Sequence, residues 1–118
     1  MSRFRPAATN YIPVLDLAAA AAWYSDKFGL RQYTIKFDDS QRGLELKAAN
    51  EIFFVLGPSG VPAKAETPML YASDIERARK YLTARGVEIG DVQKNRQGTT
   101  FFEIRDPEGH IIEICEEP

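Results

Sequence analysis

Hydrophobic and polar residues follow the same order twice along this chain. Residues 9–16 and 67–74 each read as a short β-strand that ends on an aspartate, Asp16 or Asp74, a residue typical of a helix N-cap. A threonine lies seven positions before each aspartate, and the two aspartates are 58 residues apart. The sequence therefore predicts an internal repeat that spans half the chain.

After each aspartate, apolar residues recur at the spacing of an α-helix. Residues 17–28 carry one apolar stripe, and the residues after Asp74 carry another whose opposite side is charged. Gly29 and Gly86 come where these patterns stop, and glycine adopts the left-handed conformation that ends many helices. We expect two amphipathic helices that end at these glycines.

Alternating apolar residues after each helix predict three strands per half. They lie near residues 33–37, 44–46, 52–56, 88–94, 99–105 and 110–116. A tight turn, Asp106–Gly109, precedes the last strand. We expect a single domain over residues 1–118, with pseudo-repeat halves at 8–57 and 66–116 and a Gly/Pro-rich linker at 58–65.

The predicted fold is α+β, with two tandem βαβββ units. A single unit of this kind cannot cover both faces of its own sheet, so the two must pair. Helices on the outer faces would leave two curved, mixed, four-stranded sheets around a central cavity. We expect a small-molecule pocket there.

Composition excludes several classes of protein. The chain has 118 residues, 44% of them hydrophobic, and a net charge of -2, which argues against nucleic-acid binding. No stretch approaches the ~20 apolar residues that cross a bilayer. The one cysteine, Cys115, cannot form an internal disulfide, which favours a reducing compartment and hence the cytoplasm.

Three motifs resemble the vicinal oxygen chelate superfamily, which includes glyoxalase I, extradiol dioxygenases and bleomycin-resistance proteins. They are the junction at Asp16 with Trp23-Tyr24 and Phe28-Gly29, the junction at Asp74 with Gly86-Val87, and the run 106–113, Asp-Pro-Glu-Gly-His-Ile-Ile-Glu. The resemblance covers residues 9–115. It implies the paired βαβββ fold and a homodimer in which strands of both chains build the cavities.

The resemblance also implies four metal-ligand positions, which here hold Thr9, Thr67, Phe54 and Glu113. Only Glu113 is of a usual ligand type, whereas a stable site needs about three such donors. The chain has one His and one Cys. We therefore expect no metal or other cofactor, although Glu45 or Glu51, or His110 of a second chain, would be alternative donors.

Strand alternation assigns the side chains that line the pocket. The predicted ligand-binding residues are Thr9, Tyr11, Phe54, Thr67, Met69, Tyr71, Phe102 and Glu113, with Phe102 opposite Glu113. Rings around one carboxylate suit a flat, partly apolar ligand with a donor or a positive charge. The alternative is that these rings only fill a core, and that Glu113 pairs with Arg105 or a tyrosine hydroxyl.

Three functions remain open from the sequence. The first is a metal-free protein that binds or sequesters a small aromatic or cationic compound, such as an antibiotic, without catalytic residues. The second is a metal-dependent lyase, isomerase or dioxygenase. The third is a non-catalytic structural or regulatory dimer. Gly57–Gly60 lacks the ending of a phosphate-binding loop, and no nucleophile triad is present.

Overall fold

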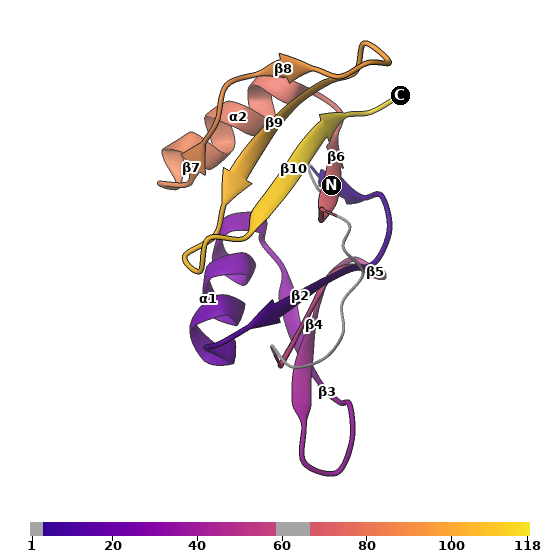
Figure 1. The fold of residues 1–118 in the computed structure, drawn as a ribbon, viewed down its shortest axis with the longest axis vertical. Helices are drawn as coiled ribbons and strands as arrows, with labels where there is room; N and C mark the ends of the chain where they lie inside the picture. The colour runs from indigo at the N-terminus through magenta and orange to yellow at the C-terminus, as the bar shows by residue number, and fades with distance from the viewer. Residues whose placement is uncertain (1–3, 59–66) are drawn as a thin grey trace. The chain divides into compact units, whose positions relative to one another are not determined.

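The computed structural model describes residues 4–58 and 67–118, which form two compact units. Residues 9–58 form the N-terminal unit, and residues 4–8 with 67–118 form the C-terminal unit. Each has one helix and one sheet, which confirms the α+β class and the repeated order of elements (Figure 1). The linker beyond Pro58 lies outside the described residues. That the halves make a single domain stays a prediction.

The N-terminal unit has the predicted four-stranded sheet, in the order β2-β5-β4-β3. Its strands are β2 (Asn10–Val14), β3 (Arg31–Lys36), β4 (Arg42–Ala48) and β5 (Glu51–Pro58), and its helix is α1 (Leu17–Phe28). Strand β2 is parallel to β5, and the other pairs are antiparallel. Helix α1 packs against β4 and β5.

The C-terminal sheet has six strands rather than the predicted four, in the order β1-β6-β10-β9-β7 with β8 also paired to β9. Its elements are β1 (Phe4–Pro6), β6 (Met69–Ala72), α2 (Ile75–Ala84), β7 (Glu88–Ile89), β8 (Gln93–Lys94), β9 (Thr100–Arg105) and β10 (Ile111–Glu116). Strand β1 was not predicted and pairs antiparallel with β6. The strand expected over 88–94 is divided into β7 and β8.

Both helices begin and end as predicted. The Asp16 carboxylate accepts a hydrogen bond from the Ala19 N–H at 3.0 Å, and the Asp74 carboxylate accepts one from the Arg77 N–H at 3.1 Å. These bonds satisfy backbone donors that the first helical turn leaves free. Gly29 and Gly86 have φ of 66° and 79°, the left-handed conformation that ends a helix.

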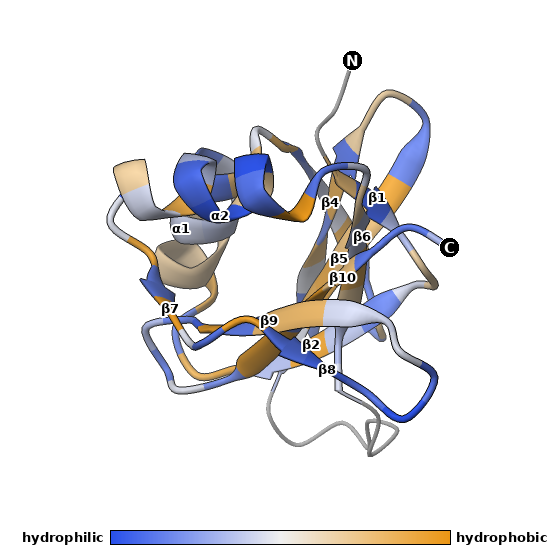
Figure 2. Ribbon diagram, turned by 90° about the horizontal axis from the view of Figure 1, so that it is seen from above, coloured by the Kyte–Doolittle hydropathy of each residue, from blue (hydrophilic) through white to orange (hydrophobic). Residues whose placement is uncertain are grey.

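Each sheet buries one face under its helix. In β2 and β6 every second side chain is buried, and the residues between them are half-buried on the opposite side, which we call the helix-free face. Strands β9 and β10 contain many apolar residues, whereas α2 is largely hydrophilic (Figure 2). Within the described ranges, neither helix is long and apolar enough to span a bilayer.

Candidate functional site

The turn between β9 and β10 sets which side chains face each other. Asp106 donates its N–H to the His110 carbonyl at 3.0 Å, and Gly109 donates to the Asp106 carbonyl at 3.0 Å. Gly109 has φ of 87°, so the loop is a type I turn followed by a left-handed glycine. The Asp106 carboxylate accepts the N–H groups of Glu108 and His110 at 2.9 and 2.8 Å. The loop thus contains three residues rather than four.

That shorter loop shifts the strand register by one residue. Glu113 lies opposite Glu103, and Phe102 lies opposite Ile114. Phe102 and Ile114 are both fully buried on the side of the helix. The prediction that Phe102 faces Glu113 is therefore wrong, because a one-residue shift moves every side chain of a strand to the other face.

Glu103 and Glu113 form a carboxylate pair on the helix-free face of the C-terminal sheet. Glu113 also neighbours Met69 across the parallel pairing of β10 with β6. The Cys115 thiol donates to Glu113 Oε1 at 3.1 Å. Within residues 4–58 and 67–118, no Lys or Arg forms an ion pair with either carboxylate, so the suggested pairing of Glu113 with Arg105 is absent.

The Cys115 thiol is held in its neutral form. Burial is the main cause, followed by the hydrogen bond to Glu113 and its charge, and together they raise the pKa of Cys115 to about 12. The protonated thiol is what donates to Glu113, and its sulfur also lies 3.3 Å from the Met69 sulfur. In this neutral form the thiol is a poor nucleophile at neutral pH.

Two aromatic rings border the carboxylate pair. Tyr71 and Phe101 are the register partners of Cys115 on β6 and β9, and both are half-buried. The Arg5 guanidinium lies 5.2 Å from the centroid of the Tyr71 ring and pairs with Glu117 at 2.9 Å. The Tyr71 ring therefore already accepts a cation on its face.

The predicted register of the N-terminal unit is also wrong by one residue. A bulge lies in β5, because Leu46 pairs with Phe54 while the next residue, Lys47, pairs with Ile52. The extra residue puts Val55, not Phe54, at the position that corresponds to Glu113. Phe54 is fully buried, and its ring centroid lies 4.8 Å from that of Tyr24 and 5.6 Å from that of Phe28 in α1. It belongs to the core beneath the helix.

The other predicted site residues lie on or beside the helix-free faces. Met69 and Tyr71 are in β6, and Tyr11 is in β2, with its hydroxyl donating to the Pro58 carbonyl at 3.1 Å. Burial raises the pKa of Tyr11. Thr9 directly precedes β2, Thr67 lies two residues before β6, and both are exposed.

The metal positions that the resemblance implies do not fit a metal. With the register corrected, they hold Thr9, Thr67, Val55 and Glu113, which amount to one carboxylate and two hydroxyls. Within the described ranges, no three His, Cys, Asp or Glu side chains are grouped to hold an ion. His110 closes the hairpin loop opposite Asp106, and its Nε2 lies 3.9 Å from Glu108. The expectation of a metal-free protein stays a prediction.

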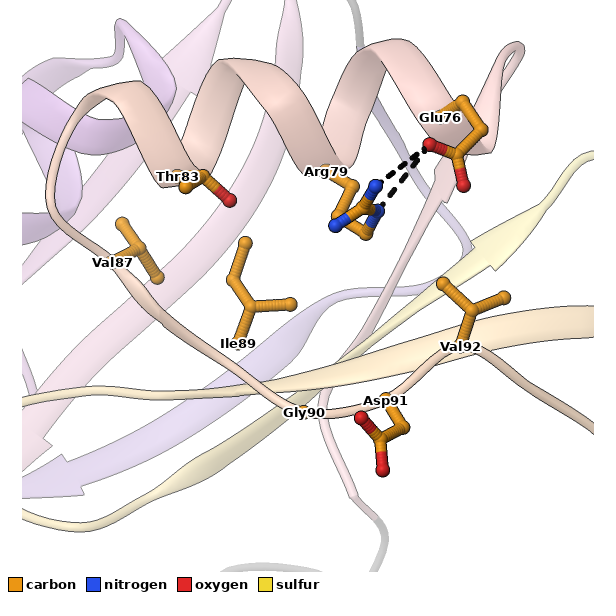
Figure 3. Close-up of a pocket in the computed structure, with 8 residues that line it drawn as sticks. All are labelled: Glu76, Arg79, Thr83, Val87, Ile89, Gly90, Asp91 and Val92. Carbon is orange, nitrogen blue, oxygen red and sulfur yellow. Dashed lines mark hydrogen bonds and ion pairs between the residues drawn. The ribbon is translucent and has the colours of Figure 1, made fainter.

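A separate pocket of about 460 Å³ opens beside α2 (Figure 3). It lies where the strand expected over 88–94 is interrupted, and it is lined by Glu76, Arg79, Thr83, Val87, Ile89, Gly90, Asp91 and Val92. Arg79 is bonded to Glu76 at 3.0 and 3.3 Å. The charged rim is thus partly neutralised within the protein.

The fold and these motifs match a known family over most of the chain. Residues 7–114 match the model of the Glyoxalase/Bleomycin resistance protein/Dioxygenase superfamily, so the chain belongs to this superfamily. No curated protein is a significant match. The predicted recognition is confirmed at the level of the superfamily.

Several solved structures share the fold. One is a member of this superfamily from Sphaerobacter thermophilus, with 21% identity, TM-score 0.69, and 92% of this chain and 94% of that chain covered. The bleomycin resistance determinant of transposon Tn5 has 17% identity, TM-score 0.70, and 93% and 96% covered. A lactoylglutathione lyase from Agrobacterium tumefaciens has 23% identity, TM-score 0.67, and 94% of both covered. At these identities the likeness concerns the fold alone.

Proposed function

We propose that this protein binds a small, flat, cationic compound without a metal, in the manner of a sequestering protein. The observation that carries the proposal is the pair Glu103 and Glu113, directly opposite each other on neighbouring strands. Like charges in this position destabilise a sheet. A bound cation would offset that repulsion, and no described Lys or Arg pairs with either carboxylate.

The surroundings of the pair favour an aromatic cation over a hydrated metal ion. Phe101 offers a ring beside Cys115, and ring faces attract organic cations, whereas one face of the Tyr71 ring is already taken by Arg5. Met69 adds a flexible, polarizable side chain beside Glu113 that adapts to ligands of variable shape. A metal ion would find too few donors here, because within the described residues no three His, Cys, Asp or Glu side chains are grouped to hold one.

Binding of proflavine, a flat aromatic cation, tests the proposal. We expect fluorescence titration to show binding that persists after dialysis against EDTA. Glu103→Gln and Glu113→Gln should each weaken proflavine binding about tenfold, the loss expected for one charge interaction of ~1.4 kcal/mol. Glu116→Gln is the matched control, because Glu116 lies on β10 and is exposed on the opposite face.

Two results would contradict the proposal. One is the absence of proflavine binding to the wild-type protein. The other is binding or turnover that requires an added divalent metal, which would favour a lyase or dioxygenase of the same superfamily. We further propose that the ligand is an antibiotic, that the protein is a homodimer and that it lies in the cytoplasm. Size-exclusion chromatography with light scattering tests the homodimer.

A further inference from the structure

Strand β3 forms one edge of the N-terminal sheet. It is last in the order β2-β5-β4-β3, and no strand that the structure describes pairs with its outer side. Its six residues, Arg31–Lys36, are exposed except for the half-buried Ile35, and its pairing with β4 is regular along the whole strand. Every second residue of an edge strand directs its N–H and C=O groups away from the sheet, where another chain can pair with them.

Positive charge is concentrated on this edge, in a chain whose net charge is -2. Arg31 is the register partner of Lys47, and Lys36 is the register partner of Arg42. Like charges in such positions destabilise a sheet. In the described part of the chain, none of these four cations forms an ion pair with a carboxylate. A bound anionic partner would therefore relieve both repulsions.

The carboxylates of the same hairpin leave these cations available. The Asp38 carboxylate accepts two N–H groups of its own turn, at 2.8 and 2.7 Å. Asp39 follows it in the exposed turn, beyond the end of the strand. Glu45 is the register partner of Tyr33 in the middle of β3. Both ends of the edge consequently stay positive.

The same charges disfavour a second copy of this chain as the partner. Two β3 strands paired antiparallel over their whole length would bring Arg31 and Lys36 of different copies together. Parallel pairing in register would bring two Arg31 side chains together at one end and two Lys36 side chains at the other. Either arrangement adds like-charge pairs to those already present, whereas acidic side chains would complement every cation.

We propose that β3 binds an extended, acidic segment of another protein as an additional strand of the N-terminal sheet. Main-chain hydrogen bonds would supply affinity, and the charges at the strand ends would supply specificity. Arg31 and Lys36 are five residues apart, so their side chains lie on opposite faces and roughly 17 Å apart along the strand. The matching segment has an acidic residue at each end of six residues. This interface involves the N-terminal unit alone and is independent of the proposed function.

A short peptide tests this docking edge. The capped peptide Glu-Val-Thr-Ile-Thr-Glu, running antiparallel to β3, places an acid opposite each terminal cation and its apolar residues opposite Tyr33 and Ile35. We expect its titration into isotope-labelled protein to shift the NMR amide signals of β3. Arg31→Gln and Lys36→Gln should each weaken binding about two- to fivefold, the range of one cross-strand charge pair. Lys80→Gln is the matched control, because it removes the same charge from an exposed position on α2.

Two altered peptides separate strand addition from general charge attraction. A peptide with lysine at both ends should not bind the wild-type protein, but it should bind the variant that carries Arg31→Glu and Lys36→Glu. A peptide with the original charges and an N-methylated backbone has no N–H groups to donate, so it should not bind the wild-type protein. Should the doubly substituted variant unfold, the lysine peptide and the wild-type protein decide the question, since binding equal to that of the acidic peptide refutes the charge argument.

Three further results would overturn the proposal. The first is that the β3 amide signals do not shift at about 1 mM acidic peptide. The second is equal binding of the N-methylated peptide, which would mean charge attraction without strand addition. The third is that the β3 amide signals shift with protein concentration when no peptide is present, which would mean that a second copy of the chain occupies the edge. Proflavine binding tests the other unit, so either proposal can fail while the other stands.

Discussion

Removing one charge of the carboxylate pair should make the ligand-free protein more stable, the opposite of what most substitutions do. Glu103 and Glu113 are direct cross-strand partners, and like charges there cost about 0.2–1 kcal/mol. Coulomb's law gives the same order, because two charges roughly 6 Å apart repel by about 0.7 kcal/mol at the dielectric of water. Both side chains are half-buried rather than enclosed, so we use the repulsion at the dielectric of water and not the larger value of a dry interior.

The assay is urea unfolding of Glu103→Gln near neutral pH and at low salt. We expect the free energy of unfolding to rise by about 0.5 kcal/mol with an unchanged m-value. In a protein that already carries Glu113→Gln, the substitution Glu103→Gln should not raise the free energy of unfolding, because the repulsion has already been removed. It should also shrink at about 1 M salt, which screens exposed charges. Glu116→Gln should change little.

A loss of stability in Glu103→Gln, or an equal gain with and without Glu113, would refute the reasoning. Either result would mean that the two carboxylates do not repel each other, and the electrostatic argument for a cationic ligand would fall with it. The same variant is expected to bind proflavine more weakly. Stability and binding should therefore change in opposite directions, as at other sites that are strained for function.

Three further substitutions or conditions test individual parts of the structure. Asp106→Ala should lower the free energy of unfolding by about 2–3 kcal/mol, since two backbone N–H groups lose a charged acceptor, and thermal unfolding measures this. Phe54→Ala should cost about 3–5 kcal/mol yet leave proflavine affinity unchanged, because Phe54 is core. Cys115 should resist iodoacetamide at pH 8 in the folded protein. Urea unfolding should also show stability falling as pH rises from 9.0 towards about 12, since the unfolded thiol ionises first.

The repeat and its helix boundaries could be predicted because each depends on local chemistry. An aspartate cap and a left-handed glycine act within one turn of a helix, so Asp16, Gly29, Asp74 and Gly86 are visible without tertiary structure. Strand β1 was missed for the opposite reason. Its three residues form a strand only by pairing with β6, far along the chain, and no local pattern marks that pairing.

The candidate site was predicted less well because register depends on single residues. The left-handed Gly109 shortens one hairpin loop, and the bulge in β5 adds a residue to another strand. Alternation could not correct either error. Both strands carry adjacent phenylalanines, Phe53-Phe54 and Phe101-Phe102, so a shift by one residue still places a ring on each face. A four-residue loop would place Phe102 opposite Glu113 and Glu103 on the other face of the sheet. Glu103 was therefore not predicted as a site residue.

The two halves keep one backbone but have divided the chemistry of their helix-free faces. Glu45 and Val55 are register partners in the N-terminal sheet, as Glu103 and Glu113 are in the C-terminal sheet. The N-terminal sheet therefore has one acid at this position and lacks the repulsion that a bound cation would offset. The same sheet has Gly43 and Gly57 where the C-terminal sheet has Phe101 and Cys115, and a side chain on either glycine would meet the ring of Phe37. The proposed recognition of a cation therefore depends on the C-terminal sheet alone.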